Sequence, residues 1–205
     1  MGSDLKIGFF GGTFDPIHFG HLNLMVELKE RCHLDRVLIC PAHLSPTKKE
    51  RPVIADSSHR LKMVQLVAAD LPWVEVTEIE VGRPPPSYTV DTVELILKRE
   101  GQGSQLYLIM AEDTAYTIDK WKDPEKLLQL ATPLVGSRHG FDPNQLEGVS
   151  PTIKSKLEEG RIQIYAMDIS STRLRERLKK QLYCGHLIPS KVLDYIYENR
   201  LYYTS

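Results

Sequence analysis

The sequence is poor in cysteine, in long apolar runs and in excess charge of either sign. Its three cysteines form no C-x-x-C pair and no Cys/His cluster, which argues against a disulfide framework and against a structural zinc site. No stretch approaches the ~18 consecutive apolar residues of a membrane-spanning helix, and the N-terminus lacks the segments of a secretory signal peptide. The formal net charge of -1 shows no excess of the basic residues that general nucleic-acid binding requires. These absences predict a soluble cytoplasmic protein with no nucleic-acid or membrane partner.

Short apolar runs alternate with amphipathic stretches along most of the 205 residues, of which 41% are hydrophobic. The runs that we interpret as strands are Lys6–Phe10, Val37–Cys40, Val74–Thr77, Leu106–Met110, Leu134–Gly136 and Ile162–Tyr165. Helical patterns cover Gly20–Cys32, Ser57–Asp70, Thr89–Glu100, Glu125–Ala131, Ser171–Gln181 and Ser190–Asn199. This alternation predicts an α/β fold with a doubly wound parallel sheet and C-terminal helices. We expect residues 1–205 to form a single domain whose helical C-terminal part begins at about 169.

Two predicted loops are longer than such connections usually are. The first, Ala42–Ala55, is rich in proline, lysine and histidine, and we expect it to be functional. The second, His139–Gly160, is polar with scattered prolines, and we expect it to be mostly without function. In doubly wound sheets, ligands bind at the carboxyl ends of the strands where the strand order reverses. The chemistry is therefore expected in the loops that follow strands.

The first predicted strand runs into a glycine-rich loop, Gly11 to His21, that fits neither the P-loop pattern nor the dinucleotide-binding fingerprint. Gly11 and Gly12 carry no side chain, so a ligand can approach the backbone closely. His18 and His21 stand three residues apart at a helix start, where both imidazoles can face one side and the helix dipole favours an anion. The alternatives are a tight strand-to-helix turn and a zinc site, but zinc needs a third ligand that the spacing does not supply.

This run resembles the signature of the nucleotidyltransferase superfamily, in which an H-x-G-H element contacts ATP phosphates. Its form, G-G-T-F-D-P-x-H-x-G-H, is similar to that of the bacterial nicotinate mononucleotide adenylyltransferases, and the resemblance spans nearly the whole chain. It implies a Rossmann-like nucleotidyltransferase fold. The ATP-binding residues that it implies in this loop are Gly11, Gly12, Thr13, Phe14, His18 and His21.

A second candidate phosphate element opens the predicted helix Ser171–Gln181. Hydroxyl residues at a helix start are often simple N-caps, and that interpretation stays open. Arg175 lies one turn beyond the hydroxyls, where its planar guanidinium can converge with them on a polyphosphate. The segment is similar to the I-S-S-T-x-x-R element of the family, which implies that Ser171, Thr172 and Arg175 hold the β- and γ-phosphates.

The acceptor pocket is implied by two further segments. Thr89 belongs to a segment resembling the family's S-Y-T element, although the same residues are also an ordinary helix start. Asp113, Tyr116 and Trp121 follow the fourth predicted strand with the spacing of the family's pyridine-nucleotide pocket. A tryptophan in a polar loop either anchors the loop or offers a flat face, and stacking of a base on such a face contributes about 1–3 kcal/mol.

The sequence departs from the family pattern at two positions. Ala111 stands where glycine is usual, and Thr47 stands where the loop after the second strand usually has histidine. Lys48 is retained there and is expected to contact ATP, and His43 is a candidate substitute for the missing histidine. These changes bear on substrate detail more than on the reaction class.

The resemblance implies adenylyl transfer from ATP to nicotinic acid mononucleotide, giving deamido-NAD and pyrophosphate. We expect His18, His21 and Arg175 to be catalytic, with Lys48 beside them, by neutralising charge on the departing pyrophosphate. An adjacent polyphosphate is expected to keep the histidines protonated. Mg²⁺ is expected on the ATP phosphates, with no ligand from protein side chains.

Other interpretations remain open at this stage. One is a phosphopantetheine adenylyltransferase-like enzyme, and another is a module that senses nucleotides without turning them over. The sequence does not distinguish nicotinate from nicotinamide mononucleotide. It also leaves a homo-oligomer possible.

Overall fold

The computed structural model describes residues 5–43, 53–101, 103–137, 143–146 and 148–203. Its sheet has the strand order β3-β2-β1-β4-β5-β6, and every neighbouring pair is parallel. The strands are β1 (Leu5–Gly12), β2 (Arg36–Pro41), β3 (Val74–Val76), β4 (Ser104–Ala111), β5 (Thr132–Ser137) and β6 (Arg161–Gln163). The order reverses between β1 and β4, which is the arrangement of a doubly wound sheet. The predicted fold class and all six predicted strands are confirmed.

The six helices that the sequence patterns predict are present, within one or two residues at each end, together with two helices at 112–115 and 151–159 that the patterns did not predict. They are α1 (Phe19–Arg31), α2 (Ser57–Ala68), α3 (Thr89–Glu100), α4 (Glu112–Ala115), α5 (Pro124–Leu130), α6 (Pro151–Glu159), α7 (Ser171–Lys179) and α8 (Ser190–Glu198). Short 3₁₀ helices occupy η2 (Ile118–Lys120) and η3 (Pro143–Leu146). None of the described helices is long and apolar enough to cross a lipid bilayer.

The sheet is covered on both faces, which explains why its strands read as unbroken apolar runs. Successive side chains of a strand point to opposite faces. In β2, Val37 and Ile39 join a buried cluster with α1, α2, α7 and α8. Leu38 and Cys40 join a second cluster with α3, α5 and α6. Both clusters border β1 and β4, so the point of strand reversal is fixed from two sides.

The segment 139–160 contains a helix that the sequence reading missed. Helix α6 begins after Ser150, whose side-chain oxygen accepts a hydrogen bond from the Ile153 backbone N–H at 3.4 Å. Ile153 and Leu157, four residues apart, are buried against the sheet. The apolar stripe has only two residues among polar neighbours, so its periodicity was too weak to predict a helix, although serine followed by proline is a typical helix start. The expectation of a long loop is therefore wrong for 151–159, while residues 139–142 and 147 lie outside the described residues.

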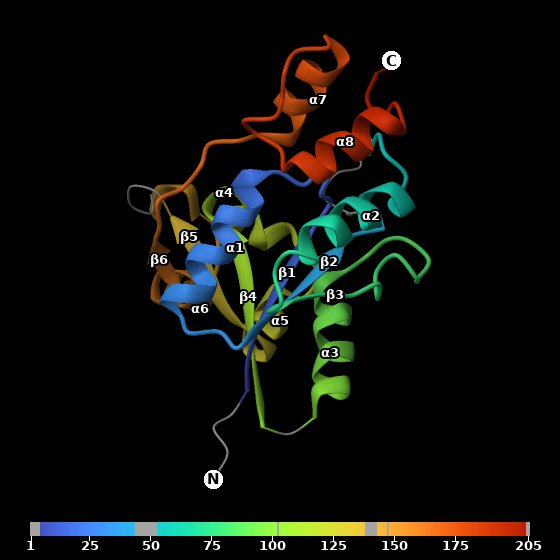
Figure 1. The fold of residues 1–205 in the computed structure, drawn as a ribbon. Helices are drawn as coiled ribbons and strands as arrows, with labels where there is room; N and C mark the ends of the chain where they lie inside the picture. The colour runs from blue at the N-terminus through green and yellow to red at the C-terminus, as the bar shows by residue number, and fades with distance from the viewer. Residues whose placement is uncertain (1–4, 44–52, 102, 138–142, 147, 204–205) are drawn as a thin grey trace.

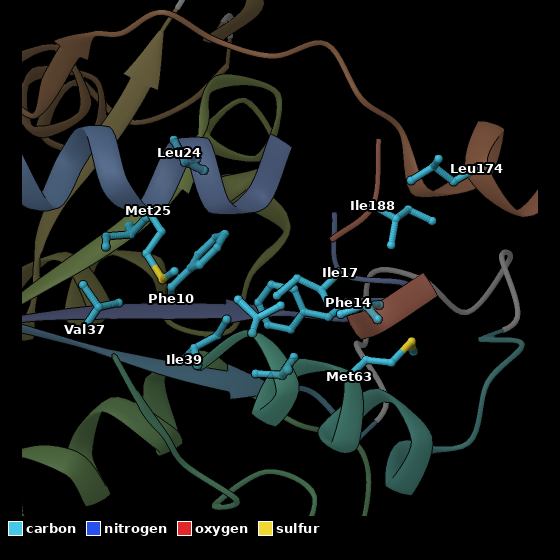
Figure 2. Packing of buried hydrophobic residues seen from close by; sticks show 14 of the residues in the cluster. Phe10, Phe14, Ile17, Leu24, Met25, Val37, Ile39, Met63, Leu174 and Ile188 are labelled. Carbon is cyan, nitrogen blue, oxygen red and sulfur yellow. The ribbon is translucent and has the colours of Figure 1, made fainter. Parts of the chain in front are cut away.

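Helices α7 and α8 lie at the end of the molecule toward which β1 runs, at the top of Figure 1. Leu174 of α7 and Ile188, which precedes α8, are buried in the same cluster as Phe14 and Ile17. Figure 2 shows Leu174 and Ile188 on the side of Ile17, with Met63 of α2 close to Phe14. The C-terminal part of the chain therefore packs on the loop that joins β1 to α1.

Candidate active site

The loop between β1 and α1 lies at the carboxyl end of β1, beside the point where the strand order reverses. Gly11 is exposed at the strand end, where a ligand can reach its backbone. At Gly12, a Cβ atom would lie 2.8 Å from the ring of Phe14, which is closer than packing allows. Phe14 itself has a φ of 50°, in the left-handed region. Gly12 therefore lets the chain turn back tightly over the Phe14 ring.

His18 and His21 face the same side of the start of α1, as their spacing predicts. Their rings are stacked, with centroids 3.7 Å apart and planes inclined by 22°. The backbone N–H of His18 donates to Nδ1 of His21 at 3.3 Å. Because Nδ1 accepts this bond, a neutral His21 carries its proton on Nε2.

Burial lowers the tendency of His18 to take up a proton. Its side chain is 4% exposed, and desolvation lowers the pKa of His18 from 6.5 to about 4. Nδ1 of His18 is buried and has no hydrogen-bond partner within the described ranges. The protein by itself therefore holds His18 as a neutral imidazole at pH 7, and the protonation of His18 by an adjacent polyphosphate stays a prediction.

Phe14 and Thr13 make contacts that hold the glycine loop in place. Phe14 is buried and packs edge-on against Phe10 and His21, with centroid separations of 5.3 Å and 5.2 Å. The carbonyl of Thr13 accepts a hydrogen bond from Nη1 of Arg60 at 2.7 Å. The Phe14 ring is thus placed to support His21, and its contact with ATP stays a prediction.

The start of α7 reaches the same loop from the other end of the chain. Oγ of Ser171 donates to the carbonyl of Pro16 at 3.2 Å. Nη1 of Arg175 donates to the carbonyl of Asp15 at 2.7 Å, and its Nη2 donates to Oγ1 of Thr172 at 3.3 Å. Ser170, the N-cap residue, makes no side-chain capping bond within the described residues. The structure therefore places Ser171 and Arg175 at the glycine loop, and their contacts with the β- and γ-phosphates stay a prediction.

The predicted acceptor residues lie beyond β4 and at the start of α3. Tyr116 and Trp121 are half-buried against the second apolar cluster, and Asp113 is exposed. Lys122, next to Trp121, donates to Asp91 of α3 at 2.8 Å and lies 4.9 Å from the ring centre of Tyr88. This contact brings the loop of Trp121 to the start of α3, where Thr89 is the first residue.

Four further positions were singled out in the sequence, and the structure describes two of them. Lys48 and Thr47 lie outside the described residues. The backbone N–H of His43 donates to Oγ of Ser87 at 3.3 Å, so the end of β2 is joined to the segment that precedes α3. Ala111 is the last residue of β4 and pairs with Gly136 of β5.

Comparison with known proteins gives consistent results over nearly the whole chain. Residues 9–177 match the model of the cytidylyltransferase-like family. A probable nicotinate-nucleotide adenylyltransferase of Methylacidiphilum infernorum is 35% identical over 200 residues, which is 98% of this chain and 93% of the relative. One of Roseiflexus castenholzii is 39% identical over 199 residues, covering 96% of this chain and 98% of the relative. This chain belongs to the nicotinate-nucleotide adenylyltransferase family.

Solved structures support the fold of this adenylyltransferase family member. Plasmodium falciparum nicotinic acid mononucleotide adenylyltransferase complexed with NaAD has a TM-score of 0.74 at 19% identity, covering 96% of this chain and 97% of that one. A putative nicotinate-nucleotide adenylyltransferase from Vibrio parahaemolyticus has a TM-score of 0.68 at 17% identity, covering 98% and 96%. These structures confirm the fold, and the curated relatives confirm the family that the glycine loop indicated.

Sequence reasoning about this adenylyltransferase missed a group of buried polar residues below the loop. Arg60 is 1% exposed, and it donates to the backbone carbonyls of Thr13, Ala42, His43 and Ala55. Desolvation lowers its pKa, an effect that the nearby Asp15 opposes. One signal could have revealed it: Arg60 shares a helical stripe with Met63, Val64 and Val67, so its pattern places a cation on the apolar face of α2.

A second buried polar group lies near the predicted acceptor residues. Oγ1 of Thr92 donates to Oε1 of Glu80 at 2.8 Å and accepts from Nη2 of Arg83 at 2.6 Å. Burial raises the pKa of Glu80. The group fixes the segment between β3 and α3, and only the tertiary structure brings its members together.

Proposed function

We propose that this chain transfers the adenylyl group of ATP to nicotinic acid mononucleotide and releases pyrophosphate, a step of NAD biosynthesis. One observation carries the proposal. Ser171 and Arg175 donate hydrogen bonds to carbonyls of the glycine loop, which lies where the strand order reverses. A triphosphate at this place would contact both the glycine loop and the start of α7. The names of the relatives, which are similar over nearly their full lengths, support the same reaction.

The reaction is a direct displacement at the α-phosphorus of ATP. A phosphate oxygen of the mononucleotide forms the new bond to this phosphorus, and the bond between it and the bridging oxygen of the β-phosphate breaks. The acceptor is already an anion at neutral pH, so no protein base is required. Catalysis then depends on alignment of the two phosphates and on stabilisation of the charge that accumulates on pyrophosphate.

The roles of the site residues follow from their charge states. Arg175 is a permanent cation whose fork of N–H groups suits phosphate oxygens. The neutral His18 acts in the free protein as a hydrogen-bonding group, and an arriving polyphosphate raises the affinity of both imidazoles for a proton. Lys48 is proposed as a further cation from the sequence resemblance.

Mg²⁺ is proposed to accompany ATP. The described residues contain no group of three or more His, Cys, Asp or Glu side chains placed to hold a metal ion. Phosphate oxygens are themselves suitable ligands for Mg²⁺. When bound there, the ion neutralises part of the triphosphate charge.

The pyridine ring of the acceptor is proposed to stack on Trp121, with Thr89, Asp113 and Tyr116 around it. The support is the adjacency of the Trp121 loop and the start of α3, which Lys122 joins. A half-buried indole keeps one side for its anchoring contacts and leaves the other for a flat ligand. We further propose that residues 1–205 act as one domain, and that the three free cysteines reflect a reducing cytoplasm.

The test is the release of pyrophosphate from Mg-ATP with three acceptors: nicotinate mononucleotide, nicotinamide mononucleotide and phosphopantetheine. The expected result is the highest kcat/KM with nicotinate mononucleotide and formation of deamido-NAD. Preference for phosphopantetheine would move the chain to the other adenylyltransferase branch. Binding of ATP without pyrophosphate release from any acceptor would instead favour a nucleotide sensor.

A further inference from the structure

The carboxylate of Asp15 lies buried under the glycine loop and is held by donors from two distant segments. Asp15 is 3% exposed. Its Oδ2 accepts from the backbone N–H of Ile54 at 2.9 Å, and its Oδ1 accepts from that of Ala55 at 3.2 Å. Oδ1 also accepts from the hydroxyl of Tyr202 at 2.7 Å, across 187 positions of sequence. The orientation of this carboxylate is thus set partly by a residue close to the C-terminus.

Arg175 lies next to this carboxylate but does not form a close ion pair with it. Its Nη1 is 2.7 Å from the Asp15 carbonyl oxygen and 3.8 Å from Oδ2. The bond to the carbonyl joins a cation to a neutral acceptor. A bond to the carboxylate would be charge-assisted on both sides and therefore stronger. In the observed arrangement, an incoming phosphate therefore competes for Arg175 against the weaker of the two acceptors.

Tyr202 is well placed to maintain this arrangement. It is 6% exposed and belongs to the apolar cluster that contains Phe14, Ile17 and Leu174. Burial and the neighbouring Asp15 raise the pKa of Tyr202, so its hydroxyl keeps its proton and remains a donor. Arg60, below the same loop, holds the carbonyls of Thr13 and Ala55 in place.

We propose that Tyr202 is a positioning residue for ATP binding: its hydroxyl holds the Asp15 carboxylate away from Arg175 and so leaves Arg175 available to the triphosphate. This inference rests on the proposed function only in taking ATP as the ligand of Arg175. Without the hydroxyl, Oδ1 loses its shortest hydrogen bond. The carboxylate then turns toward Arg175, and ATP must displace a full ion pair.

The first measurement is the Kd of Mg-ATP, by calorimetry without acceptor, for the wild type and Tyr202→Phe. The variant keeps the ring and removes one oxygen atom. We expect Kd to rise about tenfold, the effect of one hydrogen bond to a charged group, with the acceptor KM changed much less. Tyr203→Phe is the matched control, since Tyr203 is adjacent and its ring lies 6.3 Å from that of Tyr197. Equal Kd values for the two variants would overturn the proposal.

A double-mutant cycle tests whether Tyr202 acts through Arg175. In the Arg175→Ala background, Tyr202→Phe should leave the Kd of Mg-ATP nearly unchanged, because the Arg175 guanidinium that would pair with the Asp15 carboxylate is absent. A purely structural role would weaken ATP binding by the same factor in both backgrounds, and that result would overturn the proposal.

Thermal melting separates these outcomes from a general loss of stability. The shift of Tm caused by Mg-ATP is referred to the ligand-free Tm of each variant, so reduced stability alone does not mimic weaker binding. If the wild type binds ATP but transfers no adenylyl group, the proposed reaction fails while this inference remains testable through Kd. If the reaction proceeds and the Tyr202→Phe Kd equals that of the wild type, only this inference fails.

Discussion

His18 and Asp15 are buried polar residues in the loop that is proposed to bind the triphosphate. Placing such groups out of water is costly unless they are hydrogen-bonded. Asp15 meets this requirement with three donors, whereas Nδ1 of His18 has no partner among the described residues. An unsatisfied buried nitrogen beside an expected phosphate site is consistent with a group that finds its partner only when the ligand is bound.

Removing either imidazole is expected to reduce turnover strongly. His18→Ala and His21→Ala should each lower kcat by about 100-fold or more, because a hydrogen bond to the departing phosphate is lost. Steady-state kinetics with saturating Mg-ATP measures the effect, and circular dichroism checks that the fold persists. Near-normal kcat in both variants would remove these residues from the mechanism.

Burial of His18 also predicts how stability depends on pH. Well above pH 6.5, His18 is neutral in both the folded and the unfolded chain. As the pH falls from 6.5 to about 4, the unfolded chain takes up a proton that the folded chain resists. The free energy of unfolding should therefore fall in this window, by roughly 2–3 kcal/mol from this group.

Urea unfolding between about pH 7 and about pH 4.5 tests this dependence. His18→Gln replaces the titrating ring with a neutral side chain, so its free energy of unfolding should fall less over the same window. Parallel pH profiles for the wild type and His18→Gln would contradict the lowered pKa.

At the scale of elements, α7 serves two purposes because of its helical spacing. Leu174 and Leu178 are buried in the cluster beneath the glycine loop, and their spacing of four places them on one side of the helix. Ser171 and Arg175, also four apart, bond to the carbonyls of Pro16 and Asp15. The apolar side fixes the helix so that its polar side meets the loop.

The loop between η2 and α5 is expected to determine acceptor affinity. Trp121→Ala should raise the KM for the mononucleotide more than the KM for ATP, because a stacking contact contributes about 1–3 kcal/mol to base binding. Initial-rate kinetics with each substrate varied in turn gives both constants. Equal increases in the two KM values would refute the stacking role.

Helix α6 is expected to contribute stability and not catalysis. Ser150→Ala removes the oxygen that accepts from the Ile153 N–H and donates to Glu125, so the free energy of unfolding should fall by about 1 kcal/mol. Denaturant titration measures this loss, while KM and kcat should stay within experimental error. A large fall in kcat without a fall in stability would assign this segment a functional role.

For the whole molecule, the strand order decides where the chemistry takes place. Strands β1 and β4 are neighbours in the sheet but are separated by β2 and β3 in sequence. The loops after β1 and β4 therefore leave the sheet side by side, with their helices on opposite faces. An ATP-binding loop and an acceptor loop on either side of this reversal fit a transfer between two nucleotides.

Removal of Mg²⁺ is expected to stop the reaction without affecting the fold. EDTA should abolish pyrophosphate release, because the triphosphate charge is no longer neutralised. The Tm of the ligand-free protein should not change, since the proposed ion arrives with ATP. A marked fall of Tm on chelation would indicate a metal bound by the protein itself.

The sequence alone determined the fold class, the strands and the family. Apolar runs such as Val37–Cys40 are detectable because a strand buried on both faces needs no polar residue. The glycine loop is detectable because its residues are contiguous, and the stacking of His18 on His21 follows from a spacing of three at a helix start. Helix α6 escaped detection because its apolar stripe is only two residues long.

Only the tertiary structure decided which residues act together and in what charge state. Arg175 bonds to the backbone carbonyl of Asp15 and Tyr202 bonds to its carboxylate because packing brings together segments more than 150 positions apart, which no local pattern encodes. The neutrality of His18 likewise follows from desolvation by its surroundings, and its sequence position carries no sign of it. Local periodicity is set by the backbone, whereas burial and long-range hydrogen bonds exist only once the chain has folded.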